Sequence, residues 1–203
     1  MKHAKHLIAA LALACAATAC TPSAEAPPAP PAPPAPAAPP PPAPPAPPTP
    51  PAPPAAAAAS VAMAPTQGHA VAGTLSLSAA AQGVHITGRL EGAAAGGTHG
   101  FHVHEVGDCS APDGSSAGAH FNPDGHAHGH PGEGEHHAGD MPNVVADEHG
   151  VIAVDLIAPG LTLGDGGARD IAGRALVLHA SADDYATQPS GNSGARIACG
   201  VIR

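Results

Sequence analysis

The sequence predicts an all-β domain, and three observations favour this class. From about residue 57 onward, short apolar stretches are separated by Gly, Pro and Asp, and helical periodicity is almost absent. Some stretches alternate strictly, as in residues 74–78, where Leu75 and Leu77 would share one face of a strand. The roughly 147 residues from 57 to 203 are enough for one sandwich or barrel.

Seven segments carry the strand pattern in this part of the chain. They are residues 60–64, 69–78, 84–90, 100–105, 150–156, 175–179 and 195–202. Between Cys109 and Asp147 the pattern fails, and a long loop rich in Gly and His takes its place. Loops of this length inside a compact domain are usually functional or disordered. We therefore expect the chemistry of the protein to lie in or near this loop.

Residues 1–19 have the features of an export signal. Lys2 and Lys5 precede an apolar run that ends in small residues just before Cys20. The run is shorter than the roughly 20 residues that cross a bilayer, so a lasting membrane span is not expected. A lipoprotein signal peptidase would cut before Cys20, and this cysteine would then be acylated. Cleavage by ordinary signal peptidase, with an incidental Cys20, is the alternative. The lipidated form predicts a periplasmic protein anchored to the membrane.

Residues 20–56 are predicted to be an extended linker, because they consist almost entirely of Pro and Ala. Proline fixes φ and removes backbone donors, so a polyproline spacer reaching ~100 Å, at about 3.1 Å per residue, is expected. The linker is either a stalk that lifts the following domain away from the membrane or a neutral connection. The domain itself would span residues 57–203.

The charge balance argues against a nucleic-acid-binding protein. After residue 56 the chain has fifteen acidic residues, five arginines and no lysine. Such a surface repels phosphate backbones and anionic headgroups at long range. An anionic substrate would therefore need local positive charge, including that of metal ions.

Two cysteines remain for the folded domain if the signal is removed and Cys20 is acylated. They are Cys109 and Cys199. An oxidising compartment favours a disulfide between them, and closing a loop of about 90 residues would contribute ~4–5 kcal/mol in the chain-entropy model. Two free buried thiols are the alternative.

Histidines are concentrated in one region, with nine of the fifteen between His99 and His137. Imidazole is the commonest protein ligand for zinc and copper. His102 and His104 are two apart on a predicted strand, which places both side chains on one face about 7 Å apart. This spacing suits two ligands of one ion, although two exposed histidines on a strand would share it.

The long loop offers a second set of ligands. His120, His128, His137 and Asp140 would complete a tetrahedral shell for zinc with no open position. A solvated loop in which the histidines are merely tolerated is the alternative. Three further histidines compete for the same roles, and spacing does not separate them; they are His126, His130 and His136.

Five segments, taken in order, resemble segments of one known family. Residues 100–105 read Gly-Phe-His-Val-His-Glu, which is a motif of the copper/zinc superoxide dismutases. Residues 120–123 resemble its bridging-histidine segment, and residues 137–140 resemble its last zinc ligands. Residues 178–184 are similar to the segment with the fourth copper ligand. Residues 191–200 are similar to the segment with a substrate-guiding arginine and the second disulfide cysteine.

The resemblance, which covers essentially the whole domain, implies an eight-stranded Greek-key β-barrel or sandwich with long metal-binding loops. It assigns Asp183 to hydrogen bonds that link a copper histidine to a zinc histidine. It also implies the ligands of both ions: copper on His102, His104, His120 and His179, and zinc on His120, His128, His137 and Asp140.

The activity implied by the resemblance is dismutation of superoxide to oxygen and hydrogen peroxide. A redox-cycling copper would be bridged through His120 to a structural zinc, and Arg196 would orient the anion beside the copper. The Cys109–Cys199 disulfide would tie down the strand that carries this arginine. The rival interpretation is a non-enzymatic extracytoplasmic domain that binds or delivers copper or zinc. No oligomeric state is predicted.

Overall fold

The computed structural model describes residues 57–203, and the all-β prediction is confirmed there. The predicted signal, the linker and Cys20 lie outside the described residues. The described part contains nine strands and one short 3-10 helix, η1. These are β1 (Ala58–Pro65), β2 (Ala72–Ala80), β3 (Gly83–Glu91), β4 (Thr98–His99), β5 (Phe101–His104), η1 (Ser115–Ala117), β6 (Val144–Val145), β7 (Val151–Pro159), β8 (Ala175–His179) and β9 (Arg196–Val201). No helix within these residues is long and apolar enough to cross a membrane.

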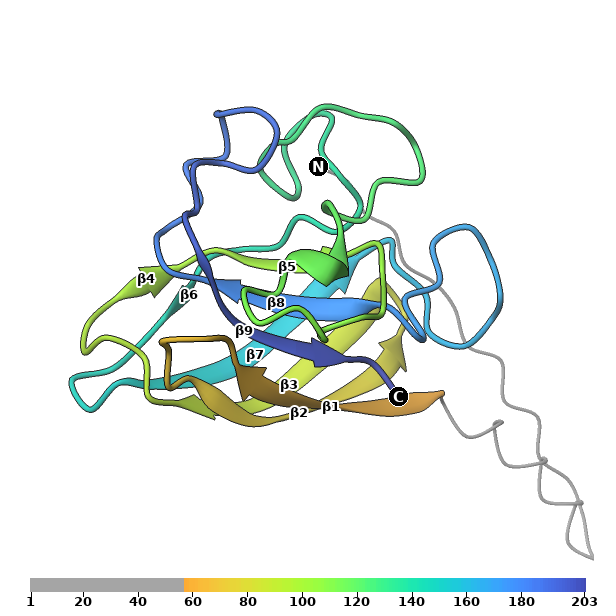
Figure 1. Ribbon diagram of the computed structural model, residues 1–203. Coiled ribbons are helices and arrows are strands. Elements are labelled where there is room, and N and C mark those ends of the chain that lie inside the picture. The colour runs from red at the N-terminus through yellow and green to blue at the C-terminus, as the bar shows by residue number, and fades with distance from the viewer. Residues whose placement is uncertain (1–56) are drawn as a thin grey trace, which may run out of the picture. The chain divides into compact units, whose positions relative to one another are not determined.

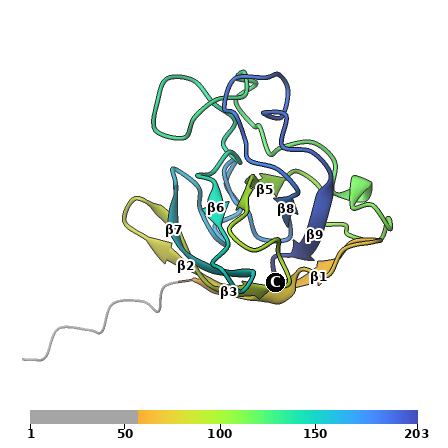
Figure 2. The same ribbon diagram turned by 90° about the vertical axis from the view of Figure 1, so that its left-hand side faces the viewer.

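Seven strands form one curled antiparallel sheet in the order β5-β8-β9-β1-β2-β3-β7 (Figures 1 and 2). Strand β1 joins the two halves of the curl, because residues 58–63 pair with β2 while Ala64 and Pro65 pair with β9. Strands β4 and β6 form a separate pair, and a bridge between Ala146 and Ile152 connects the end of β6 to β7. The curled antiparallel sheet is the barrel-like architecture that was expected.

All seven predicted strands are present, and two were missed. β4 and β6 are two residues long each, which is too short to show alternation in the sequence. The division into a seven-stranded and a two-stranded sheet therefore differs in detail from a barrel of eight similar strands.

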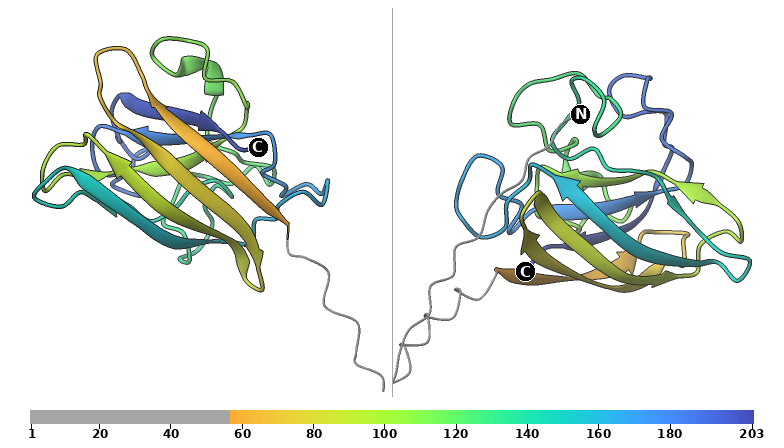
Figure 3. Two further views of the ribbon diagram at one scale, coloured as in Figure 1. Left: turned by 90° about the horizontal axis from the view of Figure 1, so that it is seen from below. Right: turned by 180° about the vertical axis from the view of Figure 1, so that it is seen from behind.

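The sheet formed by β1, β2, β3 and β7, seen side by side in Figure 3 (left), follows the predicted alternation. Leu75 and Leu77 of β2 are buried in the core, while Thr74 and Ser76, which alternate with them, are exposed. Strand β3 runs back along β2 after a two-residue turn, with Ala80 paired to Gly83. One face of this sheet therefore covers the core and the other faces solvent.

Strand β5 differs because both of its faces are buried. Phe101 and Val103 point into the hydrophobic core, whereas His102 and His104 lie on the opposite face. Figure 1 shows the long loops, drawn in green to teal and in blue, on one side of β5 and β8. The loops cover the histidine face, and this is where the candidate site lies.

Candidate metal centre

The first group of candidate ligands comes from two adjacent strands and one loop. His102 and His104 belong to β5, and His179 ends the neighbouring strand β8. His120 comes from the long loop, and its backbone forms a bridge with that of His104. One ring nitrogen from each of the four residues lies within 4.8 Å of the others. All four side chains are buried.

The second group surrounds the carboxylate of Asp140. His120, His128 and His137 each bring a ring nitrogen within 4.8 Å of the others and of this carboxylate. The distances from Asp140 Oδ1 to the three Nδ1 atoms are 2.8, 3.0 and 3.4 Å respectively. A tetrahedron with zinc–ligand bonds of about 2.0–2.1 Å has edges of roughly 3.3 Å. The group thus has the size of a tetrahedral zinc shell.

His120 belongs to both groups. Its Nδ1 lies 2.8 Å from Asp140 Oδ1, in the second group. Its other nitrogen, Nε2, is buried and has no hydrogen-bond partner among the described residues. The two sides of one imidazole therefore serve two different groups, which is the geometry of a bridging ligand.

Several buried nitrogens in the two groups have no hydrogen-bond partner within the described part of the chain. They are Nδ1 of His102, Nε2 of His120, Nδ1 of His128 and Nδ1 of His137. Buried polar atoms are normally hydrogen-bonded, so a cluster of this kind calls for a ligand. Four imidazoles suit copper, and three imidazoles with one carboxylate suit zinc. The residues present therefore fit both metals.

Hydrogen bonds to carbonyl oxygens determine which ring nitrogen of His104 and of His179 is free to bind a metal. His104 Nδ1 donates to the carbonyl of Gly118 at 2.9 Å, and His179 Nδ1 donates to that of Gly194 at 3.3 Å. Since a carbonyl oxygen only accepts, the proton must sit on Nδ1 in both rings. The two Nε2 atoms, which lie 3.4 Å apart, are left with free lone pairs for one ion.

Asp183 connects the two groups by hydrogen bonds to one histidine of each. Its Oδ2 accepts from Nε2 of His102 at 2.8 Å, and its Oδ1 accepts from Nε2 of His128 at 2.9 Å. The side chain is buried, so these hydrogen bonds are not exchanged for water. Asp183 thereby orients one histidine of each group and leaves the Nδ1 of each ring for a metal.

The electrostatics of the first group favour neutral imidazoles. Burial and the neighbouring histidine His120 lower the pKa of His104 to about 2. Burial and His102 lower the pKa of His179 to about 3. Both rings are neutral at pH 7, as metal ligands must be.

In the second group the electrostatics favour positive charge, because the group contains the buried carboxylate of Asp140. Burial raises the pKa of Asp140, but hydrogen bonds from His120, His128 and His137 outweigh it and hold the pKa well below its usual range. Burial also lowers the pKa of His128, yet Asp140 and Asp183 prevail and raise it to about 9. The buried carboxylates thus attract positive charge to the position that a cation would take.

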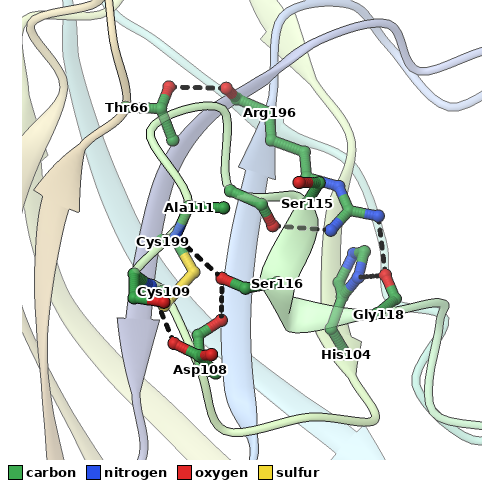
Figure 4. Close-up of a disulfide and its surroundings, with 12 residues drawn as sticks. Thr66, His104, Asp108, Cys109, Ala111, Ser115, Ser116, Gly118, Arg196 and Cys199 are labelled. Atoms are coloured by element: carbon green, nitrogen blue, oxygen red, sulfur yellow. Dashed lines mark hydrogen bonds between the residues drawn. A yellow bond between two sulfur atoms is a disulfide. The ribbon is translucent and has the colours of Figure 1, made fainter.

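A cavity of about 540 Å³ gives access to the first group. It is lined by His104, His120, His179 and Arg196, with Pro189 and Ser190 on its wall. The Arg196 guanidinium donates to the carbonyls of Gly114 at 2.7 Å and Gly118 at 2.6 Å. Figure 4 shows its side chain reaching Gly118 beside His104. A fixed positive charge therefore stands in the cavity next to the candidate copper ligands.

The predicted disulfide is present. Cys109 and Cys199 are joined by an S–S bond of 2.02 Å, with their Cα atoms 5.8 Å apart. Cys199 belongs to β9, and Cys109 lies in the loop after β5 that also carries the carbonyls of Gly114 and Gly118. Figure 4 shows the disulfide and Gly118. The disulfide therefore ties the acceptor loop of Arg196 to the strand on which Arg196 lies.

The three competing histidines lie outside both groups. His126 has its Nε2 4.0 Å from the carboxylate of Glu135. The His130 ring packs edge-on against Tyr185, with ring centroids 4.5 Å apart, and the Nδ1 of His136 lies 3.3 Å from the carbonyl of Gly134.

Sequence reasoning missed several residues that hold the ligands. The buried His99 donates from Nδ1 to the carbonyl of His179 at 2.8 Å. The side-chain amide of Asn143 exchanges two hydrogen bonds with the backbone of Asp183. These contacts join residues 40 or more positions apart and leave no local pattern in the sequence.

Fold and site together define a class, that of β-barrel-like proteins with two candidate metal sites that share one histidine. Within it, the chain belongs to the copper/zinc superoxide dismutase family, since the model of that family, "Copper/zinc superoxide dismutase (SODC)", matches residues 71–202. This confirms the resemblance seen in the sequence, and copper and zinc as the metals of the family.

Relatives agree with this assignment. "Superoxide dismutase [Cu-Zn] 2" of Aquifex aeolicus is 47% identical over 106 residues, covering 51% of this chain and 62% of the relative. "Superoxide dismutase [Cu-Zn]" of Caulobacter vibrioides is 39% identical over 137 residues, covering 65% and 78% respectively. The crystal structure of a SOD-like protein from Bacillus subtilis is 38% identical with a TM-score of 0.65, covering 71% of this chain and 97% of the other. The chain thus spans less than two thirds of the length of the Aquifex relative.

Proposed function

We propose that the protein dismutes superoxide to oxygen and hydrogen peroxide. Copper would be held by His102, His104, His120 and His179, and zinc by His120, His128, His137 and Asp140. The observation that carries the proposal is the shared, buried His120, which offers one nitrogen to each group beside a cavity that contains Arg196. Copper, when bound, takes up and returns a single electron, which is the chemistry that dismutation needs.

The residues of the chain have three tasks in this reaction. Arg196 attracts and orients the small anion, because its hydrogen bonds to two carbonyls fix the guanidinium and leave further N–H groups for the substrate. His120 lines the cavity, so its Nε2, when copper does not hold it, could carry a proton and pass it to the reduced substrate. Asp183 and the carbonyls of Gly118 and Gly194 keep the histidines in orientation.

A domain that only binds or delivers copper and zinc is the rival, and an activity assay on the metal-loaded protein separates the two. The wild type, His102→Ala and Arg196→Ala are loaded with both metals, and metal content and superoxide consumption are measured. His102→Ala is expected to lose copper and activity. Arg196→Ala is expected to keep both metals and to lose tenfold or more in rate, within the roughly 10–10³ range that focused charge adds to association.

Arg89→Ala is the matched control, because Arg89 is an exposed arginine of β3 that contacts Glu91. It should behave as wild type. A fully metallated wild type without activity would contradict the proposal and favour the binding function.

We also propose that the protein works outside the cytoplasm, anchored through Cys20. Residues 1–19 would be the signal, residues 20–56 the linker, and residues 57–203 the superoxide dismutase domain. The disulfide between Cys109 and Cys199 supports an oxidising compartment. Metabolic labelling with a fatty acid tests the anchor: the wild type should be labelled and Cys20→Ala should not. Equal labelling of the two would contradict it.

A further inference from the structure

Gln188 makes an unusual contact with the backbone of a candidate zinc ligand. Its Nε2 donates to the carbonyl of His128 at 2.9 Å, and its Oε1 accepts from the N–H of His128 at 2.9 Å. The two polar ends of one side-chain amide therefore bind the backbone N–H and the backbone carbonyl of a single residue that lies 60 positions away in the chain.

The backbone of His128 has no other hydrogen bond among the described residues. It lies in the Gly- and His-rich part of the loop, where residues 123–139 form no strand or helix. Backbone groups that secondary structure does not satisfy need another partner. The amide of Gln188 fills the place that a neighbouring strand would take.

The ring of His128 is held by the same segment of chain as its backbone. Asp183 accepts from His128 Nε2 at 2.9 Å, and Gln188 lies five positions further on. The segment between them is braced internally, because the Asp184 carboxylate accepts from the backbone N–H groups of Ala186 and Thr187. Gln188 is thus presented to His128 from a preformed turn.

We propose that Gln188 is a positioning residue for the zinc site, holding His128 so that its Nδ1 faces Asp140 and slowing the loss of zinc. Pro189 and Ser190, which follow it, line the substrate cavity. The same contact therefore keeps the zinc loop in register with the cavity wall. This inference rests on the proposed function, because it takes the group around Asp140 to be the zinc site.

The test compares Gln188→Ala and Gln188→Glu with the wild type, all loaded with copper and zinc. Transfer of zinc to a colorimetric chelator is followed together with copper retention. Removing partners of a metal ligand typically costs about 10–100-fold in affinity. Because Gln188 is exposed, we expect the low end for Gln188→Ala, about tenfold faster zinc release, with copper retained. Gln188→Glu keeps an acceptor for the His128 N–H but loses the donor, so an intermediate rate is expected.

A spectroscopic readout separates positioning from simple destabilisation. With cobalt in place of zinc, the visible absorption reports ligand geometry, and Gln188→Ala should alter it. Gln82→Ala, at an exposed glutamine in the turn between β2 and β3, is the control and should match the wild type. Wild-type zinc release and a wild-type cobalt spectrum in Gln188→Ala would overturn the inference. A wild type that takes up no zinc at all would overturn the proposed function as well.

Discussion

At the scale of single residues, the site depends on a carboxylate that is not itself in either ligand group. Asp183 accepts one hydrogen bond from His102 and one from His128, and its own backbone is held by Asn143. Its carboxylate pKa is well below the usual range, since the hydrogen bonds from the two rings outweigh the effect of burial. It remains ionised, so it can accept from both rings at once.

Replacing this carboxylate by an amide should weaken the binding of one of the two metals. In Asp183→Asn only one oxygen is left to accept, and the NH2 group would face the N–H of the other ring. One histidine must then turn, and an affinity loss of about 10–100-fold is expected for the metal that it binds. Competition titrations with copper and zinc chelators measure this loss.

Asp155→Asn is the control for this substitution, because Asp155 is an exposed carboxylate of β7 that also accepts from a histidine, His85. It should leave both affinities unchanged. Wild-type affinities in Asp183→Asn would show that the hydrogen bonds do not set the ligand orientation.

At the scale of elements, the site is placed by one strand with two buried faces and by loops that are fastened to it. β5 directs Phe101 and Val103 into the core and His102 and His104 toward the loops. The loop after β5 is fastened by the disulfide and by Ser116, which donates to the carbonyl of Asp108 and accepts from the N–H of Ala111 (Figure 4). This loop presents the carbonyls that hold Arg196.

Removing the disulfide should therefore affect stability and catalysis together. Replacing both cysteines, as Cys109→Ser with Cys199→Ser, removes a cross-link that closes 90 residues and should lower the unfolding free energy by ~4–5 kcal/mol. Denaturant titration measures this change. Activity at full metal occupancy should also fall, because Gly114 and Gly118 are no longer held against Arg196.

The double substitution leaves no thiol in the described domain, so mispairing does not complicate the comparison. Unchanged activity per bound copper, despite lower stability, would contradict the link between the disulfide and Arg196.

At the scale of the whole molecule, charge decides how the substrate arrives. Fifteen acidic residues and no lysine follow residue 56, and Arg196 is the arginine that lines the cavity, so under the proposed function Arg196 and the two metals would attract the anion. Charges in a cavity with low-dielectric walls are screened less by salt than exposed ones.

We therefore expect activity to fall only weakly as ionic strength rises. Ser190→Lys, which adds an ammonium group at the cavity wall, should raise the rate at low salt and steepen its decline. Rates measured from low to high ionic strength test both expectations. If the rate of the wild type falls with ionic strength as steeply as that of Ser190→Lys, or more steeply, then exposed charges guide the anion.

Much of the fold was predictable because the pattern that marks a strand extends over only a few neighbouring residues. Alternating residues such as Leu75 and Leu77 identify a strand and its buried face within five positions. β4 and β6 were not predicted, because a strand of two residues forms only where another segment of the chain pairs with it.

The candidate site was predictable to the extent that motifs carry it. The spacing of His102 and His104 on one strand marks them as candidate ligands. The family resemblance singled out His128 and His137 among six loop histidines. The residue types and their order along the chain thus contained seven of the nine described strands, the ligand candidates and the class of protein. Only the tertiary structure decided that Nδ1 of His120 lies against Asp140 while its Nε2 has no partner among the described residues, and that the side chain of Gln188 binds the backbone of His128. The two contacts join residues 20 and 60 positions apart, and packing between such segments leaves no periodicity for a sequence to display.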